Sequence, residues 1–141
     1  MLRLLLQCRR IYFIRKTNKQ NVAIIGLGRV GSAFLDAILS LAKRGINLAY
    51  AVEKNDTPGR ARAIASGIKI VTIDEMIALG DEVDVIFDLS GNHDVRKELR
   101  KKLVATNNTH TVIASETIAR VVWSLITHEE LPLSKGKKIG Y

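Results

Sequence analysis

The sequence predicts an α/β fold built on a doubly wound parallel β-sheet with helices on both faces. Two observations predict this class. Short runs rich in valine, isoleucine and alanine alternate with segments of helical periodicity along most of the 141 residues. The connections between them are short and contain glycine, asparagine and aspartate, which is typical of βαβ units. Right-handed crossovers then give the strand order 3-2-1-4-5, and the length fits one domain.

The first predicted strand, residues 22–25, runs directly into a glycine turn. Gly26, Gly28 and Gly31 follow the G-x-G-x-x-G spacing, and a helix is predicted after them over residues 30–44. Gly26 allows the sharp turn, Gly28 lets a pyrophosphate approach the backbone, and Gly31 lets the helix pack closely on the strand. The unpaired N–H groups and the dipole at the start of this helix attract phosphate. The sequence therefore predicts a Rossmann-like dinucleotide site.

Two further residues of this turn belong to the predicted site. Arg29 and Val30 are expected beside the pyrophosphate, where Arg29 can pair with it; alternatively, Arg29 is an exposed residue at the helix start. The helix that follows is expected to end at Gly45, with basic residues in its last turn. Its buried face is predicted from apolar residues at i, i+3, i+4 and i+7, namely Phe34, Ala37, Ile38 and Leu41.

The second predicted strand, residues 46–52, ends at a carboxylate. Glu53 lies 22 residues past Gly31, near the spacing expected for the group that binds the adenosine ribose. A carboxylate accepts hydrogen bonds from ribose hydroxyls and repels a 2′-phosphate, so NAD is favoured over NADP. The nearby cations Lys54, Arg60 and Arg62 count against this preference, because a cation can hold a phosphate. The alternative is a solvated carboxylate at a strand end.

The remaining elements follow the same alternation. A turn over residues 54–59 is followed by a helix over 59–66 and a strand over 68–72. Asp74 is expected to cap a helix over 75–79 that ends at Gly80. The rest of the sheet and its helices are predicted over residues 83–87 (strand), 94–103 (helix), 111–114 (strand) and 117–125 (helix, capped by Ser115 or Glu116).

The turn after strand 83–87 supplies the other side of the predicted site. Ligands of doubly wound sheets bind where the strand order reverses, so this turn is expected to meet the glycine turn. Ser90, Gly91 and Asn92 are expected to border the nicotinamide ribose; a helix cap requires the same residue types and is the alternative. His93 is a candidate acid or base, or a solvated residue. The cations of the next helix are expected on a solvated face: Arg96, Lys97, Arg100, Lys101 and Lys102.

The net charge of +8 is concentrated near the N-terminus. Residues 1–20 carry six cations and no acid, which predicts a basic arm, and residues 131–141 form a basic tail. Such an arm can contact nucleic acid, anionic lipid or an acidic partner, or it is a solvated leader. Nucleic acid is disfavoured because no aromatic residues interleave with the basic run at 96–102. The apolar patch at residues 11–14 is a candidate contact for a partner protein or a second copy.

Composition excludes several kinds of site. Cys8 is the only cysteine, so an intramolecular disulfide is excluded and a reducing cytoplasm is expected. The sequence contains no zinc or iron–sulfur ligand cluster, and no apolar run is long enough for a transmembrane helix. The dinucleotide-binding domain itself is expected over residues 21–130.

Three stretches resemble the nucleotide-binding half of the glucose-fructose oxidoreductase and inositol dehydrogenase family, over about residues 21–120. They are the glycine turn, Asp84-Val85-Ile86-Phe87-Asp88, and residues 112–119. The resemblance implies NAD(P) binding with Glu116 at the cofactor, since Glu116 matches the acid of the family's Glu-Lys-Pro motif. Thr117 stands at the position of the lysine that supports catalysis, and a threonine cannot supply its charge. The turn through Asn92 also resembles that of homoserine-type dehydrogenases.

The sequence leaves three functional interpretations. In the first, the chain is an NAD(P)-binding, oxidoreductase-like module, and a separate chain supplies the substrate site. In the second, it is a non-catalytic redox sensor that binds NAD(H) and acts through a partner. Thr117 favours this second interpretation. The chain also resembles small Rossmann domains attached to bacterial sensory proteins, and that resemblance implies the same role. The third is another ligand, such as an adenine nucleotide or coenzyme A. No catalytic residue is assigned.

Overall fold

The computed structural model describes residues 19–41 and 44–132, and the strands within them form one parallel sheet. The strand order is β3-β2-β1-β4-β5, which confirms the predicted doubly wound, Rossmann-like α/β fold. The predicted basic arm up to residue 18, the patch at 11–14 and the tail from 133 lie outside the described residues. The strands are β1 (Gln20–Ile25), β2 (Ile46–Val52), β3 (Lys69–Ile70), β4 (Val85–Asp88) and β5 (Val112–Ala114).

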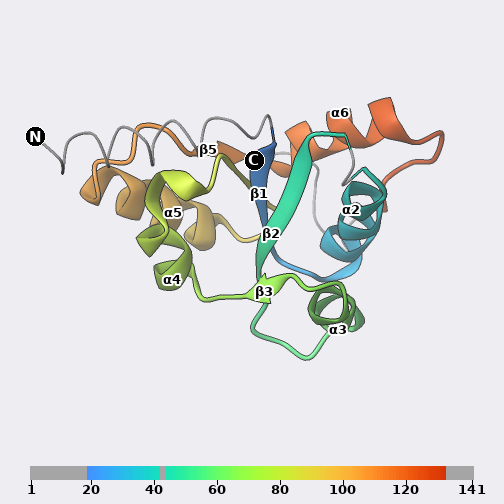
Figure 1. The fold of residues 1–141 in the computed structure, drawn as a ribbon, viewed down its shortest axis with the longest axis horizontal. Coiled ribbons are helices and arrows are strands. Elements are labelled where there is room, and N and C mark those ends of the chain that lie inside the picture. The colour runs from blue at the N-terminus through green and yellow to red at the C-terminus, as the bar shows by residue number, and fades with distance from the viewer. Residues whose placement is uncertain (1–18, 42–43, 133–141) are drawn as a thin grey trace, which may run out of the picture.

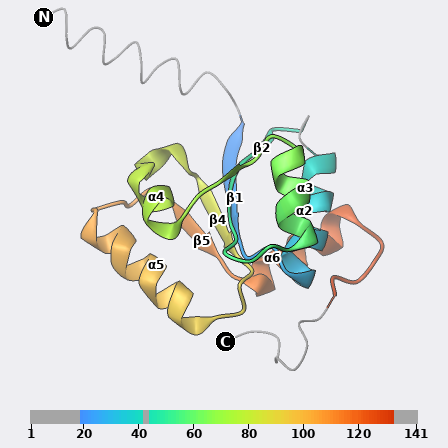
Figure 2. The same ribbon diagram turned by 90° about the horizontal axis from the view of Figure 1, so that it is seen from below.

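Helices cover both faces of this sheet and make three layers (Figure 1 and Figure 2). One face carries α2, α3 and α6, and the other carries α4 and α5, as the turned view shows clearly. A short 3₁₀ helix, Gly80–Glu82, leads into β4. The helices are α2 (Arg29–Ser40), α3 (Pro58–Ala65), α4 (Ile73–Ala78), α5 (His93–Ala105) and α6 (Glu116–Ile126).

The central strand β1 separates two hydrophobic cores. Val22 and Ile24 point into the core beneath α2, α3 and α6, whereas Ala23 and Ile25 point into the core beneath α4 and α5. All four side chains are at most 5% exposed. Because side chains alternate along a strand, an unbroken apolar run is what a strand covered on both faces requires.

The predicted end of the first helix is wrong. Strand β2 matches its prediction residue for residue, but α2 ends at Ser40, four residues before the predicted end. Gly45 does not cap the helix; it has a φ of +87° in the turn before β2, and its carbonyl accepts from the backbone N–H of Gln20 at 2.8 Å. Gly45 therefore belongs to the turn that places the start of β2 beside the start of β1.

The predicted cap of α4 is also wrong. Thr72 is the cap, because its Oγ1 accepts from the backbone N–H of Glu75 at 3.1 Å. The helix therefore starts at Ile73, before the predicted residue 75, and Asp74 lies in its first turn. Strand β3 is correspondingly short and pairs only two residues, Lys69 and Ile70, with β2.

Arg96 was predicted on a solvated helix face, and the structure corrects this. Arg96 is 8% exposed and its Nε lies 3.4 Å from Oδ2 of Asp88. The reason is helical periodicity: Arg96 precedes the buried Leu99 by three residues and Leu103 by seven, so it lies on the inner face of α5. Lys102 forms ion pairs with Asp74 on α4 and Glu98 on α5. The other three cations of this helix are exposed as predicted: Lys97, Arg100 and Lys101.

Two glycines of the turn after β1 are required by packing within the protein. A Cβ at Gly31 would lie 1.7 Å from the carbonyl oxygen of Gly26, so α2 can approach β1 only without a side chain there. Gly26 has a φ of +89°, and a Cβ on it would come within 2.8 Å of the Ser90 backbone. The two turns at the ends of β1 and β4 are thus in direct backbone contact.

We predict that Gly31→Ala destabilises the protein even though alanine is the better helix former by about 1 kcal/mol. The clash with the Gly26 carbonyl forces the backbone to shift, which we expect to cost about 2 kcal/mol net and to lower the melting temperature by about 6 °C. Thermal and urea unfolding followed by circular dichroism measure this change. Unchanged or raised stability would contradict the close packing of α2 on β1.

Candidate functional site

Two adjoining hollows lie along the carboxyl edge of the sheet. The first occupies the switch point between β1 and β4 and has a volume of about 520 Å³. It brings together eight of the residues predicted for the cofactor site: Gly26, Gly28, Arg29, Val30, Glu53, Lys54, Ser90 and Asn92. Residues from three separate stretches of the chain therefore meet where a doubly wound fold binds its ligands.

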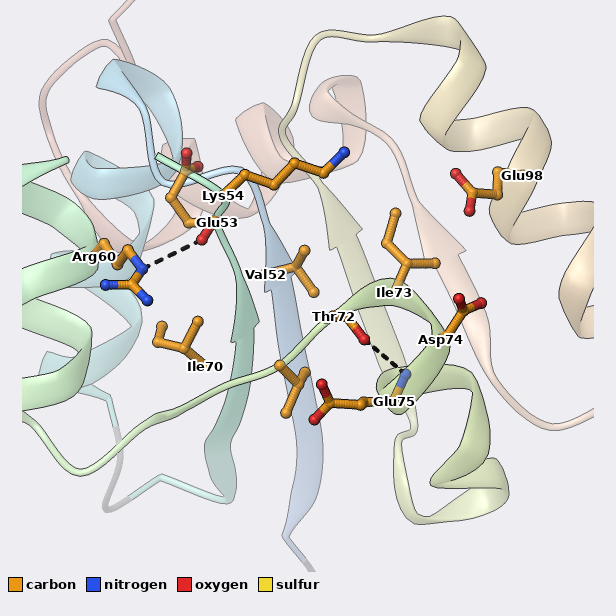
Figure 3. Close-up of a pocket in the computed structure, with 11 residues that line it drawn as sticks. Val52, Glu53, Lys54, Arg60, Ile70, Thr72, Ile73, Asp74, Glu75 and Glu98 are labelled. Carbon is orange, nitrogen blue, oxygen red and sulfur yellow. Dashed lines mark hydrogen bonds between the residues drawn. The ribbon is translucent and has the colours of Figure 1, made fainter. Parts of the chain in front are cut away.

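The second hollow, of about 570 Å³, lies beside the end of β2 (Figure 3). Its apolar part comes from Val52, Ile70 and Ile73, with Arg60 on one side and acidic residues of α4 and α5 on the other. The first hollow shares with it the residues Val52, Glu53, Lys54 and Ile73. The two hollows therefore form one groove across the edge of the sheet.

Gly28 differs from the other glycines of its turn. No described atom lies within 4 Å of a Cβ built on it, and its φ of −76° is accessible to any residue. Nothing in the packing of the described chain therefore requires glycine at this position. The missing side chain leaves space over the backbone, in the wall of the first hollow.

The start of α2 is open as well. Within the described residues no side chain caps it, and its first turn contains no acid. By contrast, Thr57, Thr72 and Asn92 cap α3, α4 and α5 with side-chain hydrogen bonds. Helix α2 is 12 residues long, and its uncapped start directs N–H groups and the positive end of its dipole at the first hollow. Such a helix start favours an anionic ligand.

Glu53 joins the end of β2 to the glycine turn. Its Oε2 accepts from the backbone N–H of Leu27 at 2.7 Å, and its Oε1 accepts from that of Asn55 at 3.1 Å. Two carboxylate oxygens offer about four acceptor positions, so acceptor capacity remains for hydroxyl groups. Glu53 lines both hollows, at the end of β2.

Arg60 approaches the same strand end from α3. Its Nε donates to the backbone carbonyl of Glu53 at 3.3 Å, and its Nη1 lies 3.8 Å from the exposed carboxylate of Asp56. Lys54 extends across the groove above Val52 (Figure 3). The acid and two cations thus lie together around the junction of the hollows.

The turn after β4 is organised by a buried carboxylate. Asp88 is 1% exposed, and its Oδ1 accepts from both the hydroxyl of Ser90 at 2.6 Å and its backbone N–H at 3.2 Å. Asn92 accepts from the backbone N–H of Asp94 at 2.9 Å and so caps α5. Asn92 therefore serves as the helix cap that was the alternative interpretation, while it also lines the first hollow.

Three predicted site residues and the candidate acid or base lie outside the groove. Gly31 packs under the turn, and Gly91 lines neither hollow. His93 is the first residue of α5 and is exposed. Glu116 is 8% exposed at the start of α6, where its Oε1 accepts from Nη2 of Arg120 at 2.6 Å.

Two features of the groove were not predicted from the sequence: the far wall of the second hollow and the ion pair behind the first. Asp74 and Glu98 line the second hollow, and both accept from the ammonium of Lys102. These hydrogen bonds, first to Asp74 and then to Glu98, raise the pKa of Lys102 above its usual 10.5. A signal that Arg96 faces inward was present, since Arg96 follows the spacing of the apolar stripe on α5.

Neither a metal centre nor a membrane span is found in the part of the chain that the structure describes. Among residues 19–41 and 44–132, no three histidine, cysteine or carboxylate side chains are grouped so that they could hold a metal ion. Over the same residues, no helix is long and apolar enough to cross a membrane.

Comparison with known proteins shows the fold. No protein-family model and no curated protein matches the chain. Among solved structures, GenD2 from gentamicin A biosynthesis, in complex with NAD, is 19% identical with a TM-score of 0.51. Homoserine dehydrogenase from S. aureus is 18% identical with a TM-score of 0.53. RSP in complex with β-NADH, whose structure is also described as that of a Rex-family repressor, is 15% identical with a TM-score of 0.51.

These matches differ in how much of each protein they include. They cover 67%, 77% and 83% of this chain, respectively. The chain spans 26% of GenD2, 29% of the homoserine dehydrogenase and 65% of RSP. The shared part is the Rossmann-like α/β domain in each case, at identities that establish architecture alone.

Proposed function

We propose that the groove binds a nicotinamide dinucleotide, with its pyrophosphate over Gly28 at the start of α2. The observation that carries this proposal is the open space at Gly28, which no contact in the described chain explains. A diphosphate approaches the backbone most closely where no Cβ intervenes, and the uncapped N–H groups of α2 are directed there. Arg29, which lines the same hollow, supplies a positive charge nearby.

The two hollows suit the two ends of such a ligand. Val52, Ile70 and Ile73 offer an apolar surface for a flat base, and Glu53 lies between them and the glycine turn. The adenosine is therefore assigned to the second hollow and the nicotinamide nucleoside to the first, beside Ser90 and Asn92. The solved structures of GenD2 with NAD and of RSP with NADH, which share the fold, support this class of ligand.

Glu53 favours NAD over NADP. Its carboxylate lines both hollows and retains acceptor capacity for ribose hydroxyls, and its charge repels a 2′-phosphate. Arg60 is the opposing group, but its Nε is engaged by the Glu53 carbonyl and its Nη1 faces Asp56. We therefore propose NAD as the ligand.

The role of the bound dinucleotide has two candidates. The first is an oxidoreductase-like module that presents the cofactor to a substrate site on another chain. The second is a redox sensor, which is favoured by the likeness to RSP, a protein solved both with β-NADH and with β-NAD⁺ and operator DNA. Thr117, exposed at the lysine position of the resembled family, and the exposed His93 agree with a non-catalytic role. Self-association and a cytoplasmic location also stay predictions.

Gly28→Ala is the direct test of the pyrophosphate position. We expect at least a tenfold loss of NAD affinity, measured by calorimetry, because the methyl group occupies the space assigned to the diphosphate. The melting temperature should stay within about 3 °C of the parent, since the added Cβ meets no described atom and the backbone angle is ordinary. Undiminished affinity in a folded Gly28→Ala protein would remove the main support for the proposal.

Glu53→Gln tests the ribose contact and the preference for NAD. The glutamine keeps the size of the side chain and an acceptor for Leu27, but it loses the charge. We expect about tenfold weaker NAD binding and a smaller ratio of NAD to NADP affinity. Glu130→Gln, the same substitution at an exposed acid that lines neither hollow, is the matched control and should change neither. Equal effects of the two substitutions would show that Glu53 does not contact the ribose.

The two roles are separated by comparing redox forms. A sensor is expected to bind NADH and NAD⁺ with affinities that differ at least tenfold, because a difference in binding energy is what shifts a regulatory equilibrium. Calorimetric titration of both forms, followed by hydride-transfer assays with polyols and hydroxy acids, measures this. Turnover by the chain alone would overturn the sensor hypothesis, and equal affinities without turnover would favour the cofactor-presenting module.

A further inference from the structure

Behind the wall of the first hollow lies an ion pair that the proposed function does not use. Asp88 and Arg96 have side chains that are 0% and 10% exposed, and Nε of Arg96 lies 3.4 Å from Oδ2 of Asp88. Removing two charges from water is costly, so a buried pair is weak evidence for a purely stabilising role. Its location, at the end of β4 and one turn into α5, places it directly behind Ser90.

The ion pair determines which hydrogen bonds Ser90 can make. A carboxylate has no proton to give, so the hydroxyl of Ser90 must be the donor in its 2.6 Å contact with Oδ1 of Asp88. Arg96 holds the other oxygen of the same carboxylate. The oxygen of Ser90 accepts from the backbone N–H of Asn92 at 3.3 Å and retains acceptor capacity toward the hollow. Ser90 therefore presents an acceptor, and not a donor, to a ligand.

The carboxylate of Asp88 also determines the position of the wall that Ser90 forms in the first hollow. The backbone of Ser90 lies so close to Gly26 that a Cβ on the glycine would come within 2.8 Å of its Cα and N. Asp88 holds that backbone through the N–H of Ser90 at 3.2 Å. A change in the carboxylate thus reaches the hollow through Ser90, while the open space at Gly28 and the second hollow involve other residues.

We infer that Arg96 and Asp88 are positioning residues that orient Ser90 as a hydrogen-bond acceptor for the nicotinamide nucleoside. This inference rests on the proposed function. A lone acceptor suits a ribose hydroxyl or the amide N–H of the carboxamide and repels a phosphate oxygen. The pyrophosphate belongs on the α2 side of the hollow, where N–H donors are directed at it, and the nicotinamide nucleoside on the side of β4.

The test compares NADH with ADP, which carries the adenosine and both phosphates but no nicotinamide nucleoside. We expect Arg96→Gln and Ser90→Ala each to weaken NADH binding about five- to tenfold and to leave ADP binding within twofold, by calorimetry. Lys97→Gln, the neighbouring and exposed cation, is the matched control and should change neither affinity. Because the two residues act through one contact, the double variant should be no weaker than either single variant.

Each other outcome overturns the inference. If Arg96→Gln weakens ADP and NADH alike, Arg96 acts through overall stability. If it weakens neither, or if the losses add in the double variant, Ser90 is not oriented by the pair. Should Arg96→Gln fail to fold, Ser90→Ala decides alone, and an unchanged ratio of NADH to ADP affinity overturns the inference. Failure of the proposed function is recognised separately, because then the unmodified chain does not bind NADH, whether or not it binds ADP.

Discussion

The structure depends on the backbone contact between the turns that follow β1 and β4. Gly26, at a φ of +89°, lies against the Ser90 backbone, and the carbonyl of Gly26 lies against Gly31 of α2. These contacts tolerate no side chain, so the start of α2 is held at the point where the strand order reverses. Because the chain leaves β1 toward α2 on one face of the sheet and leaves β4 toward α5 on the other, a groove opens beside the contact, and every part of the proposed site faces it.

The charges along the groove divide it into regions of different chemistry. The helix start at Gly28 offers donors and a positive dipole end, Glu53 offers acceptors at the junction, and Ser90 offers an acceptor on the β4 side. A dinucleotide carries phosphates between two nucleosides rich in hydroxyls, and this order of donors and acceptors matches it. The match supports the proposed class of ligand.

Much of the fold could be predicted because its determinants are local. Strand β2 was predicted to the residue, since an apolar β-favouring run is bounded by a glycine and an acid. The end of α2 and the start of α4 were not: the first depends on a contact with β1, and the second on which of two nearby candidate residues caps the helix. Gly45 is used in the turn that starts β2 rather than as a cap, and Asp74 pairs with Lys102 on α5 while Thr72 caps its helix.

The sequence by itself determined the order of elements, the strand order and eight residues of the groove, because periodicity and glycine spacing are properties of the chain. Only the tertiary structure decided which glycine of the turn has empty space beside it and which are packed closely. A Cβ on Gly28 would meet no described atom, while Gly26 and Gly31 are packed against backbone. It also decided that Arg96 is buried beside Asp88. A charged side chain is buried only where an opposite charge meets it. For Arg96 that charge is Asp88, at the end of another element, and the periodicity of α5 does not specify that the two side chains meet.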